Sequence, residues 1–137
     1  MKATQTLHEQ GQSLWLDNIT RDLLDTGTLA RYIAELSVTG LTSNPTIFDH
    51  AIKNSATYDA AIRNKVKEGK SGEDLFFELA LEDLTRAADL FRPIWDRTRG
   101  VDGWVSLELI NPILWQVQPT QVAEVGLAAL QRLLNCQ

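Results

Sequence analysis

The chain has 137 residues, of which 44% are apolar and 23% charged, a length and balance typical of one globular domain that buries a core. Its 18 Asp and Glu residues outnumber its 13 Lys and Arg residues, giving a formal net charge of −5. This balance excludes the basic face that a nucleic acid or an anionic membrane requires. We therefore expect a single domain over residues 1–137, with no nucleic-acid partner and no membrane partner.

The start of the chain and its single cysteine give an expectation about location. Residues 1–12 are polar and lack the hydrophobic core of a signal peptide, and no apolar stretch approaches membrane-spanning length. Cys136 has no second cysteine with which to form an internal disulfide, as is usual in a reducing compartment. These features predict a cytoplasmic protein.

The first half of the chain begins with strand and helix patterns in alternation. A short apolar run over residues 14–19, which contains Asp17, predicts the first strand. Residues 21–36 predict a helix that is broken at Gly27, because the later part carries apolar side chains at helical spacing. Residues 38–41 then predict a second strand.

A cluster of uncharged polar residues follows this second strand. Thr42, Ser43 and Asn44 occupy the predicted strand-to-helix turn, and Pro45 suits the first turn of the next helix. The amide and hydroxyl groups are suited to recognising neighbouring hydroxyls on a small polyol. The same residue types are equally typical of turns and helix caps, which alone would explain them.

Further helices are predicted on both sides of the third strand. Residues 56–67 are amphipathic, and a longer helix with a wide apolar face begins near Ser71 and bends or ends near Pro93. A last helix covers residues 120–134, after a break at Asn-Pro. The acidic residues of the long helix are interpreted as its solvent-facing side and a complement to its dipole; they are residues 73, 74, 78, 82 and 83.

The third predicted strand covers residues 104–109 and carries a carboxylate, Glu108, as the first strand carries Asp17. Because strands and helices alternate, we predict βα units around a parallel sheet. Polar side chains at the carboxyl ends of parallel strands share one rim, so Asp17, Asn44 and Glu108 are expected to converge there. Carboxylates at such a rim can serve as general acid and base. The open alternative is that each residue merely caps the next segment.

Two other candidate motifs, a phosphate-binding loop and a histidine metal site, do not meet the structural requirements of those sites. Residues 69–71 read Gly-Lys-Ser, like the end of a phosphate loop, but the required glycine is replaced by Asn64 and a helix precedes the segment. His8 and His50 have no partner at metal-ligand spacing and are expected to be solvated. We therefore predict no metal site.

Taken together, these residues resemble those of the transaldolases, class I aldolase-type barrels that transfer a dihydroxyacetone unit between phosphorylated sugars in the pentose phosphate pathway. The resemblance covers residues 11–108 and is carried by Thr-Ser-Asn-Pro at 42–45 and Asp-Gly-Trp-Val-Ser-Leu-Glu at 102–108. It implies an α/β fold that is an incomplete (β/α)8 TIM barrel, with about three parallel strands and flanking helices. It also implies a sugar phosphate substrate and no cofactor.

The resemblance implies a role for each polar side chain at the rim. Asp17 would shuttle protons during carbinolamine formation and carbon–carbon cleavage, and Glu108 would orient a catalytic water. A Schiff-base reaction needs proton delivery to a departing hydroxyl and proton removal from the substrate alcohol, and two carboxylates bridged by water supply both. The implied substrate-binding residues are Thr42, Ser43, Asn44 and Ser106.

The catalytic lysine of the resembled family lies on the next strand, in an apolar-Lys-apolar-Pro-Gly setting that this chain lacks. No lysine here is a convincing substitute: the five stand at positions 2, 53, 65, 67 and 70, in a tail, in helices or at a helix end. About three strands of eight cannot close a barrel, and they leave a strand edge and an inner face exposed.

We therefore expect a truncated transaldolase-like chain that is inactive alone. Its exposed edge and face favour self-association or pairing with a missing barrel portion supplied in trans. The alternative, from a different class, is a non-catalytic binding or assembly module that pairs with a partner chain.

Overall fold

A computed structural model describes residues 2–108 of the chain. The predicted helix over residues 120–134, the break that precedes it, and Cys136 lie outside the described residues. In chain order the elements are α1 (Ala3–Glu9), β1 (Leu14–Asp17), α2 (Arg21–Asp25), α3 (Thr28–Leu36), β2 (Val38–Ser43), α4 (Pro45–Asn54), the 3-10 helix η1 (Ala56–Tyr58), α5 (Asp59–Lys67), α6 (Gly72–Thr98) and β3 (Val105–Leu107).

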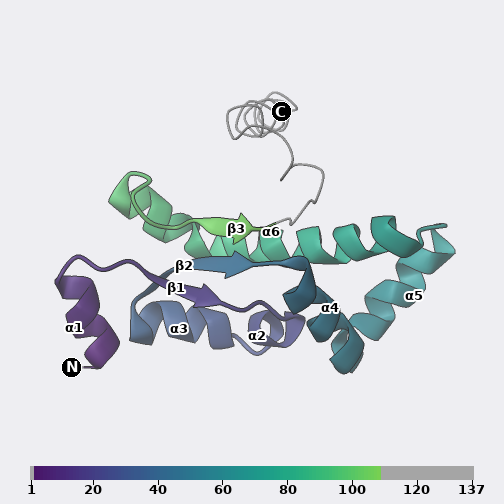
Figure 1. Ribbon diagram of the computed structural model, residues 1–137, viewed down its shortest axis with the longest axis horizontal. Helices are drawn as coiled ribbons and strands as arrows, with labels where there is room; N and C mark the ends of the chain where they lie inside the picture. The colour runs from purple at the N-terminus through teal and green to yellow at the C-terminus, as the bar shows by residue number, and fades with distance from the viewer. Residues whose placement is uncertain (1, 109–137) are drawn as a thin grey trace, which may run out of the picture.

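The three strands run side by side in the same direction, in the order β1-β2-β3 (Figure 1). Parallel neighbours need crossover connections, and helices supply both: α2 and α3 lead from β1 to β2, and α4 to α6 lead from β2 to β3. This confirms the predicted α/β fold, a parallel sheet of three strands with flanking helices, as in part of a (β/α)8 barrel.

One face of the sheet packs against the helices and forms the core. Leu41 in β2 is fully buried, and Leu16, Val105 and Leu107 pack against the same core. Burial of each such side chain contributes about 1.5–3 kcal/mol, so this face holds the sheet on the helices. The helical members of the core are Leu24, Leu29, Phe48, Ala80, Leu84, Ala87, Phe91 and Ile94.

A bulge in β2 sets the alignment of β1 against it. Leu14 pairs with Val38 but Trp15 pairs with Gly40, so Thr39 is the extra residue. The Thr39 hydroxyl accepts a hydrogen bond from the Leu14 amide at 3.2 Å, which satisfies the backbone at the irregularity. A Cβ at Gly40 would lie 2.5 Å from the Trp15 ring, so a glycine at this position lets the ring lie over the sheet.

Two helices differ from the sequence-based expectation. The N-terminal α1 was not predicted because it buries no residue and so shows no apolar stripe; an ion pair between Lys2 and Glu35, 2.9 Å apart, links it to α3. The long α6 continues through Pro93 to Thr98. The proline removes one backbone hydrogen bond, but Ile94 beside it is buried in the core and compensates. Among residues 2–108, no helix combines the length and apolar character needed to cross a membrane.

Candidate active site at the carboxyl ends of the strands

The register of the sheet places Asp17, Thr42 and Ser106 in one row. Asp17 pairs with Thr42, and Thr42 pairs with Ser106. Residues paired across parallel strands project from the same face of a sheet, so these side chains share the face opposite the apolar core. Asp17 is exposed on that face, where its carboxylate stays hydrated while remaining accessible to a ligand.

A second polar row lies one step further along the strands. Asn44 and Glu108 each follow a member of the first row by two residues, and strand alternation gives them the same face. The Glu108 amide donates to the Ser43 carbonyl at 2.8 Å, which extends the pairing of β2 with β3 by one residue. The Thr42 hydroxyl donates to Glu108 Oε1 at 3.1 Å. The structure thus joins Thr42 and Glu108 directly.

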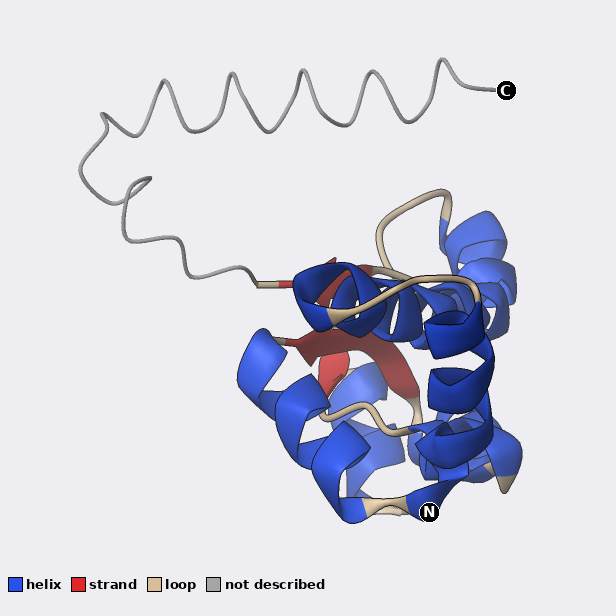
Figure 2. Cartoon of the chain, turned by 90° about the vertical axis from the view of Figure 1, so that its right-hand side faces the viewer, coloured by secondary structure: helices blue, strands red, loops and turns tan. Residues whose placement is uncertain are grey.

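Asp17 and Asn44 line a common open cleft of about 560 Å³ at this end of the sheet. Figure 2 views the chain from the side toward which the strands of Figure 1 point. The remaining walls of the cleft come from the first turns of α4 and include Thr46 and His50. These two residues were not among the predicted site residues, although their spacing of four, together with the helix start at Pro45, would have placed them on one helix face.

Asn44 divides its two polar atoms between two tasks. Its Oδ1 accepts a hydrogen bond from the Ile47 amide at 3.0 Å and caps α4, whose first residue is Pro45. The capping interpretation is therefore confirmed. The amide Nδ2 has no hydrogen-bond partner among residues 2–108 and remains a donor beside the cleft.

Ser43 lies on the other side of the strand from this cleft. The prediction that Thr42 and Ser43 belong to a turn is wrong, because β2 pairs with β3 as far as Ser43. Ser43 is only 1% exposed, and its hydroxyl donates to the Ser106 carbonyl at 2.9 Å. In this structure the side chain holds β2 and β3 together.

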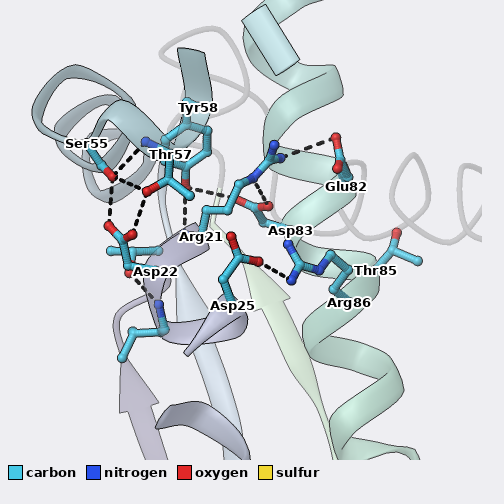
Figure 3. Close-up of polar contacts among 12 residues, drawn as sticks. Arg21, Asp22, Asp25, Ser55, Thr57, Tyr58, Glu82, Asp83, Thr85 and Arg86 are labelled. Carbon is cyan, nitrogen blue, oxygen red and sulfur yellow. Dashed lines mark hydrogen bonds and ion pairs between the residues drawn. The ribbon is translucent and has the colours of Figure 1, made fainter. Parts of the chain in front are cut away.

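The helix that follows β1 is anchored by a buried ion pair (Figure 3). Arg21, at the start of α2, donates from Nε to Asp83 Oδ1 at 2.8 Å, and the Tyr58 hydroxyl donates to Asp83 Oδ2 at 2.7 Å. The same Tyr58 oxygen accepts from the Arg21 amide at 2.9 Å. Burial raises the pKa of the Asp83 carboxyl and of the Tyr58 phenol. The interpretation of residue 83 as part of the solvent-facing side of its helix is wrong, since Asp83 is fully buried.

A neighbouring network ties α2 to η1. The Asp22 carboxylate accepts from the Thr57 hydroxyl at 2.5 Å and from the Ser55 hydroxyl at 2.7 Å (Figure 3). These hydrogen bonds lower the pKa of Asp22. Asp25, at the end of α2, pairs with Arg86 of α6 at 2.5 Å. The contacts of Arg21, Asp22 and Asp25 thus hold α2 in place, and α2 begins four residues after Asp17.

All five lysines of the chain fall within the described residues, and none lies on a strand or lines the cleft. Lys2 and Lys53 pair with carboxylates on the helices, and Lys65 and Lys70 both pair with Glu78. Lys67 is exposed on α5. The described part of the chain therefore offers no amine beside Asp17 and Asn44.

Parallel strands joined by crossover helices are the architecture of part of a (β/α)8 barrel, the fold in which active sites lie at the carboxyl ends of the strands. Comparison with known proteins narrows this fold class. A family model described as Transaldolase/Fructose-6-phosphate aldolase matches residues 14–120. The chain belongs to this family.

Curated relatives support the same assignment. The transaldolase of Arthrobacter sp. (strain FB24) is 43% identical over 117 residues, which are 85% of this chain and 32% of the relative. The transaldolase of Saccharopolyspora erythraea is 42% identical over 120 residues, 88% of this chain and 32% of the relative. The transaldolase of Trichodesmium erythraeum is 39% identical over 110 residues, which are 80% of this chain and 29% of the relative. The chain spans about a third of the length of the curated relatives it matches.

Proposed function

We propose that this chain carries the first part of a transaldolase active site, which moves a dihydroxyacetone unit between sugar phosphates in the pentose phosphate pathway. The observation that supports this function most directly is the pair of polar rows on one face of the sheet. Asp17, Thr42 and Ser106 form the first row, and Asn44 and Glu108 form the second. The named relatives are transaldolases, which supports the same reaction.

In this proposal Asp17 moves protons. A Schiff base forms when an amine attacks a ketone and the resulting hydroxyl leaves as water, which requires a proton. Cleavage of the neighbouring carbon–carbon bond then requires removal of a proton from a substrate hydroxyl. Asp17 is exposed and lines the cleft with Asn44, so a sugar held there meets both groups.

The other polar residues hold the substrate and water. Asn44 donates from Nδ2 to a substrate hydroxyl, while its Oδ1 keeps α4 in place. Thr42 fixes Oε1 of Glu108, which leaves Oε2 to orient a catalytic water. Ser106 adds a hydroxyl in the first row. Ser43 is a positioning residue in this scheme, because its hydroxyl holds β3 against β2.

A chimeric enzyme tests the proposal. Residues 14–108 of this chain replace the matching segment of the Arthrobacter transaldolase, and dihydroxyacetone transfer from fructose 6-phosphate is measured. We expect an active chimera in which Asp17→Asn lowers kcat about 100-fold or more, as loss of a proton-transfer group does. The matched control is Asp89→Asn, an exposed carboxylate on α6 outside the cleft. A folded chimera that is inactive, or one indifferent to Asp17→Asn, contradicts the assignment.

The chain alone is proposed to give no turnover, because none of its lysines lies beside the polar rows. The test is borohydride reduction in the presence of fructose 6-phosphate, followed by mass spectrometry of the intact chain. No covalent adduct is expected. A sugar adduct on any of the five lysines overturns this part of the proposal while leaving the chimera result to decide the rest.

A binding or assembly module remains the second candidate, and the open sheet face favours it. Trp15 is 42% exposed and lies on that face, with its ring over Gly40. Within residues 2–108, β1 and β3 each pair with β2 alone, so each has one free edge. Light scattering coupled to size-exclusion chromatography separates the two proposed functions, because a well-behaved monomer disfavours the binding or assembly module. Self-association that Trp15→Ser abolishes supports it.

A further inference from the structure

A second cavity, of about 420 Å³, lies at the amino end of the sheet, opposite the candidate active site. It is enclosed by α1, the end of α3, the start of β2 and the last turns of α6, elements that lie together on the left of Figure 1. Its walls combine apolar side chains, among them Ile33, Val38, Leu90 and Ile94, with the polar residues His8, Ser37, Thr39 and Arg97. A cavity of about 300–1,000 Å³ with apolar walls and a few polar groups has the usual character of a small-molecule site.

The charged group in this cavity is Arg97, the residue before the last one of α6. Arg97 is exposed and makes no ion pair within the described part of the chain, whereas its neighbour Asp96 is paired with Arg92 at 3.0 Å. His8 of α1 also lines the cavity, with its Nδ1 3.2 Å from the Gln12 carbonyl. The site therefore presents an unused cation and an imidazole beside apolar walls.

We propose that this cavity binds a small apolar molecule that carries one anionic group. The apolar body packs against α3 and α6, and the anion accepts hydrogen bonds from the Arg97 guanidinium, whose planar donors match a carboxylate. A bare sugar fits less well as the occupant, because it carries no anionic group for Arg97 and its hydroxyls would lie against Ile33, Val38, Leu90 and Ile94. A cation is excluded by repulsion from Arg97.

This site is independent of the proposed transferase function. It shares no lining residue with the cleft beside Asp17 and Asn44, and the two lie at opposite ends of β2. Binding is therefore tested on the full 137-residue chain without any catalytic assay.

The probe is octanoate, titrated into the isotopically labelled chain and followed by amide chemical shifts. We expect saturable shifts at Ser37 and Ile94, and weaker binding of the uncharged octanol. Arg97→Gln is expected to weaken octanoate about tenfold, the loss of one charged hydrogen bond, without changing octanol. Arg92→Gln is the matched control, since Arg92 is an exposed arginine on the same helix outside the cavity.

A pocket-filling variant gives a second, independent readout. Ala34 lines the cavity from the exposed side of α3, so Ala34→Leu occupies part of the space without disturbing the core, and leucine is a good helix former. It is expected to weaken octanoate and octanol alike. The proposal is overturned if octanoate does not bind, if both variants bind it as the parent chain does, or if the shifts gather at Trp15 and Trp104 instead.

Discussion

Asn44 performs a structural task and a proposed binding task with different atoms, so substitutions can separate them. Asn44→Ala removes the cap on α4 and is expected to lower the free energy of unfolding by about 1 kcal/mol. Asn44→Asp keeps an acceptor for the Ile47 amide and adds a charge that the helix N-terminus favours, so stability is expected to change by less than about 0.5 kcal/mol.

Urea denaturation measures both variants, and the chimeric enzyme measures function. Because aspartate lacks the Nδ2 donor, Asn44→Asp is expected to reduce transfer activity in the chimera while remaining as stable as the parent. Full activity in this variant contradicts the role given to Nδ2.

Among the carboxylates of the described residues, we expect Asp83 to lower the free energy of unfolding most when it is substituted. Asp83→Ala leaves the Arg21 guanidinium buried without its partner and removes the acceptor of the Tyr58 hydroxyl, which costs about 3–5 kcal/mol. Tyr58→Phe breaks two hydrogen bonds, one to Asp83 and one from the Arg21 amide, and leaves the ion pair, so the expected loss is about 1–3 kcal/mol. Urea denaturation measures both losses.

Glu82→Gln is the control for this pair of variants. Glu82 also lies near Arg21, at 3.2 Å, but its side chain is 45% exposed, and we expect a loss below about 1 kcal/mol. Equal losses for Glu82→Gln and Asp83→Ala would mean that the buried ion pair stabilises the chain no more than the exposed one does.

The placement of Asp17 and Asn44 at one rim was predictable because it follows from local rules. Strand alternation and parallel direction place polar residues at strand ends on one rim. The burial of Asp83 was not predictable in this way. Its partner Arg21 is 62 residues away in sequence, and an aspartate on an amphipathic helix next to Glu82 has the pattern of a solvent-facing residue until that contact is known. His50 was missed for a different reason: it lies on the first turns of α4 close to Asn44, and its helical spacing from Thr46 was not used.

At the scale of elements, the turn between α6 and β3 depends on Gly103. Its φ is +91°, a conformation that favours glycine, and a Cβ there would lie 2.5 Å from the Trp95 backbone nitrogen. The Gly103 amide donates to the Thr39 carbonyl at 2.8 Å, which aligns β3 with β2. Gly103→Ala is therefore expected to cost about 2–4 kcal/mol.

Gly40→Ala is the informative contrast. Its Cβ would also come within 2.5 Å of a neighbour, but that neighbour is the Trp15 ring, which is 42% exposed and free to rotate into solvent. The expected loss is about 1 kcal/mol, with a shift in tryptophan fluorescence. Urea denaturation compares the two variants, and similar losses contradict the distinction between backbone and side-chain collisions.

Elements with a buried face were predictable, and those without one were not. The sheet and the long α6 carry apolar side chains at regular spacing. Helix α1 buries no residue, so it leaves no periodic signal, and its contact with Glu35 of α3 depends on the tertiary fold. Pro93 suggested a helix end, but buried neighbours such as Ile94 outweigh the one lost hydrogen bond.

At the scale of the whole molecule, the two faces of the sheet divide stability from proposed function. The face against the helices contains the core around Leu41. The open face carries the polar rows at one end of the strands and the exposed Trp15 nearer the other end. A partner or further strands that cover this face would bury the Trp15 ring and leave the carboxylates at the rim.

Acid stability of the folded chain depends on carboxylates whose pKa values change on folding. Hydrogen bonds and ion pairs with Lys65 and Lys70 lower the pKa of Glu78, and a hydrogen bond from Lys2 lowers that of Glu35. A carboxyl with a lowered folded pKa stabilises the protein above its unfolded pKa, and this contribution is lost as the pH falls through the folded value. Burial has the opposite effect on Asp83, because it raises the pKa of this carboxyl in the folded state. The folded state therefore becomes less stable as the pH rises from the unfolded pKa of this group toward its folded pKa.

Glu78→Gln isolates one of these contributions. The difference in unfolding free energy between the parent chain and this variant is expected to be constant above about pH 5 and to shrink toward zero as the pH falls below about 4, where the free glutamate protonates. Urea denaturation at a series of pH values measures the difference. Salt near 1 M screens the pairing of Glu78 with lysines on the surface, so the difference should also shrink in salt at pH 7. A difference that instead grows on acidification would mean that Glu78 destabilises the folded chain, and that α5 and α6 are held together by apolar contacts such as those of Ile62 and Leu79 alone.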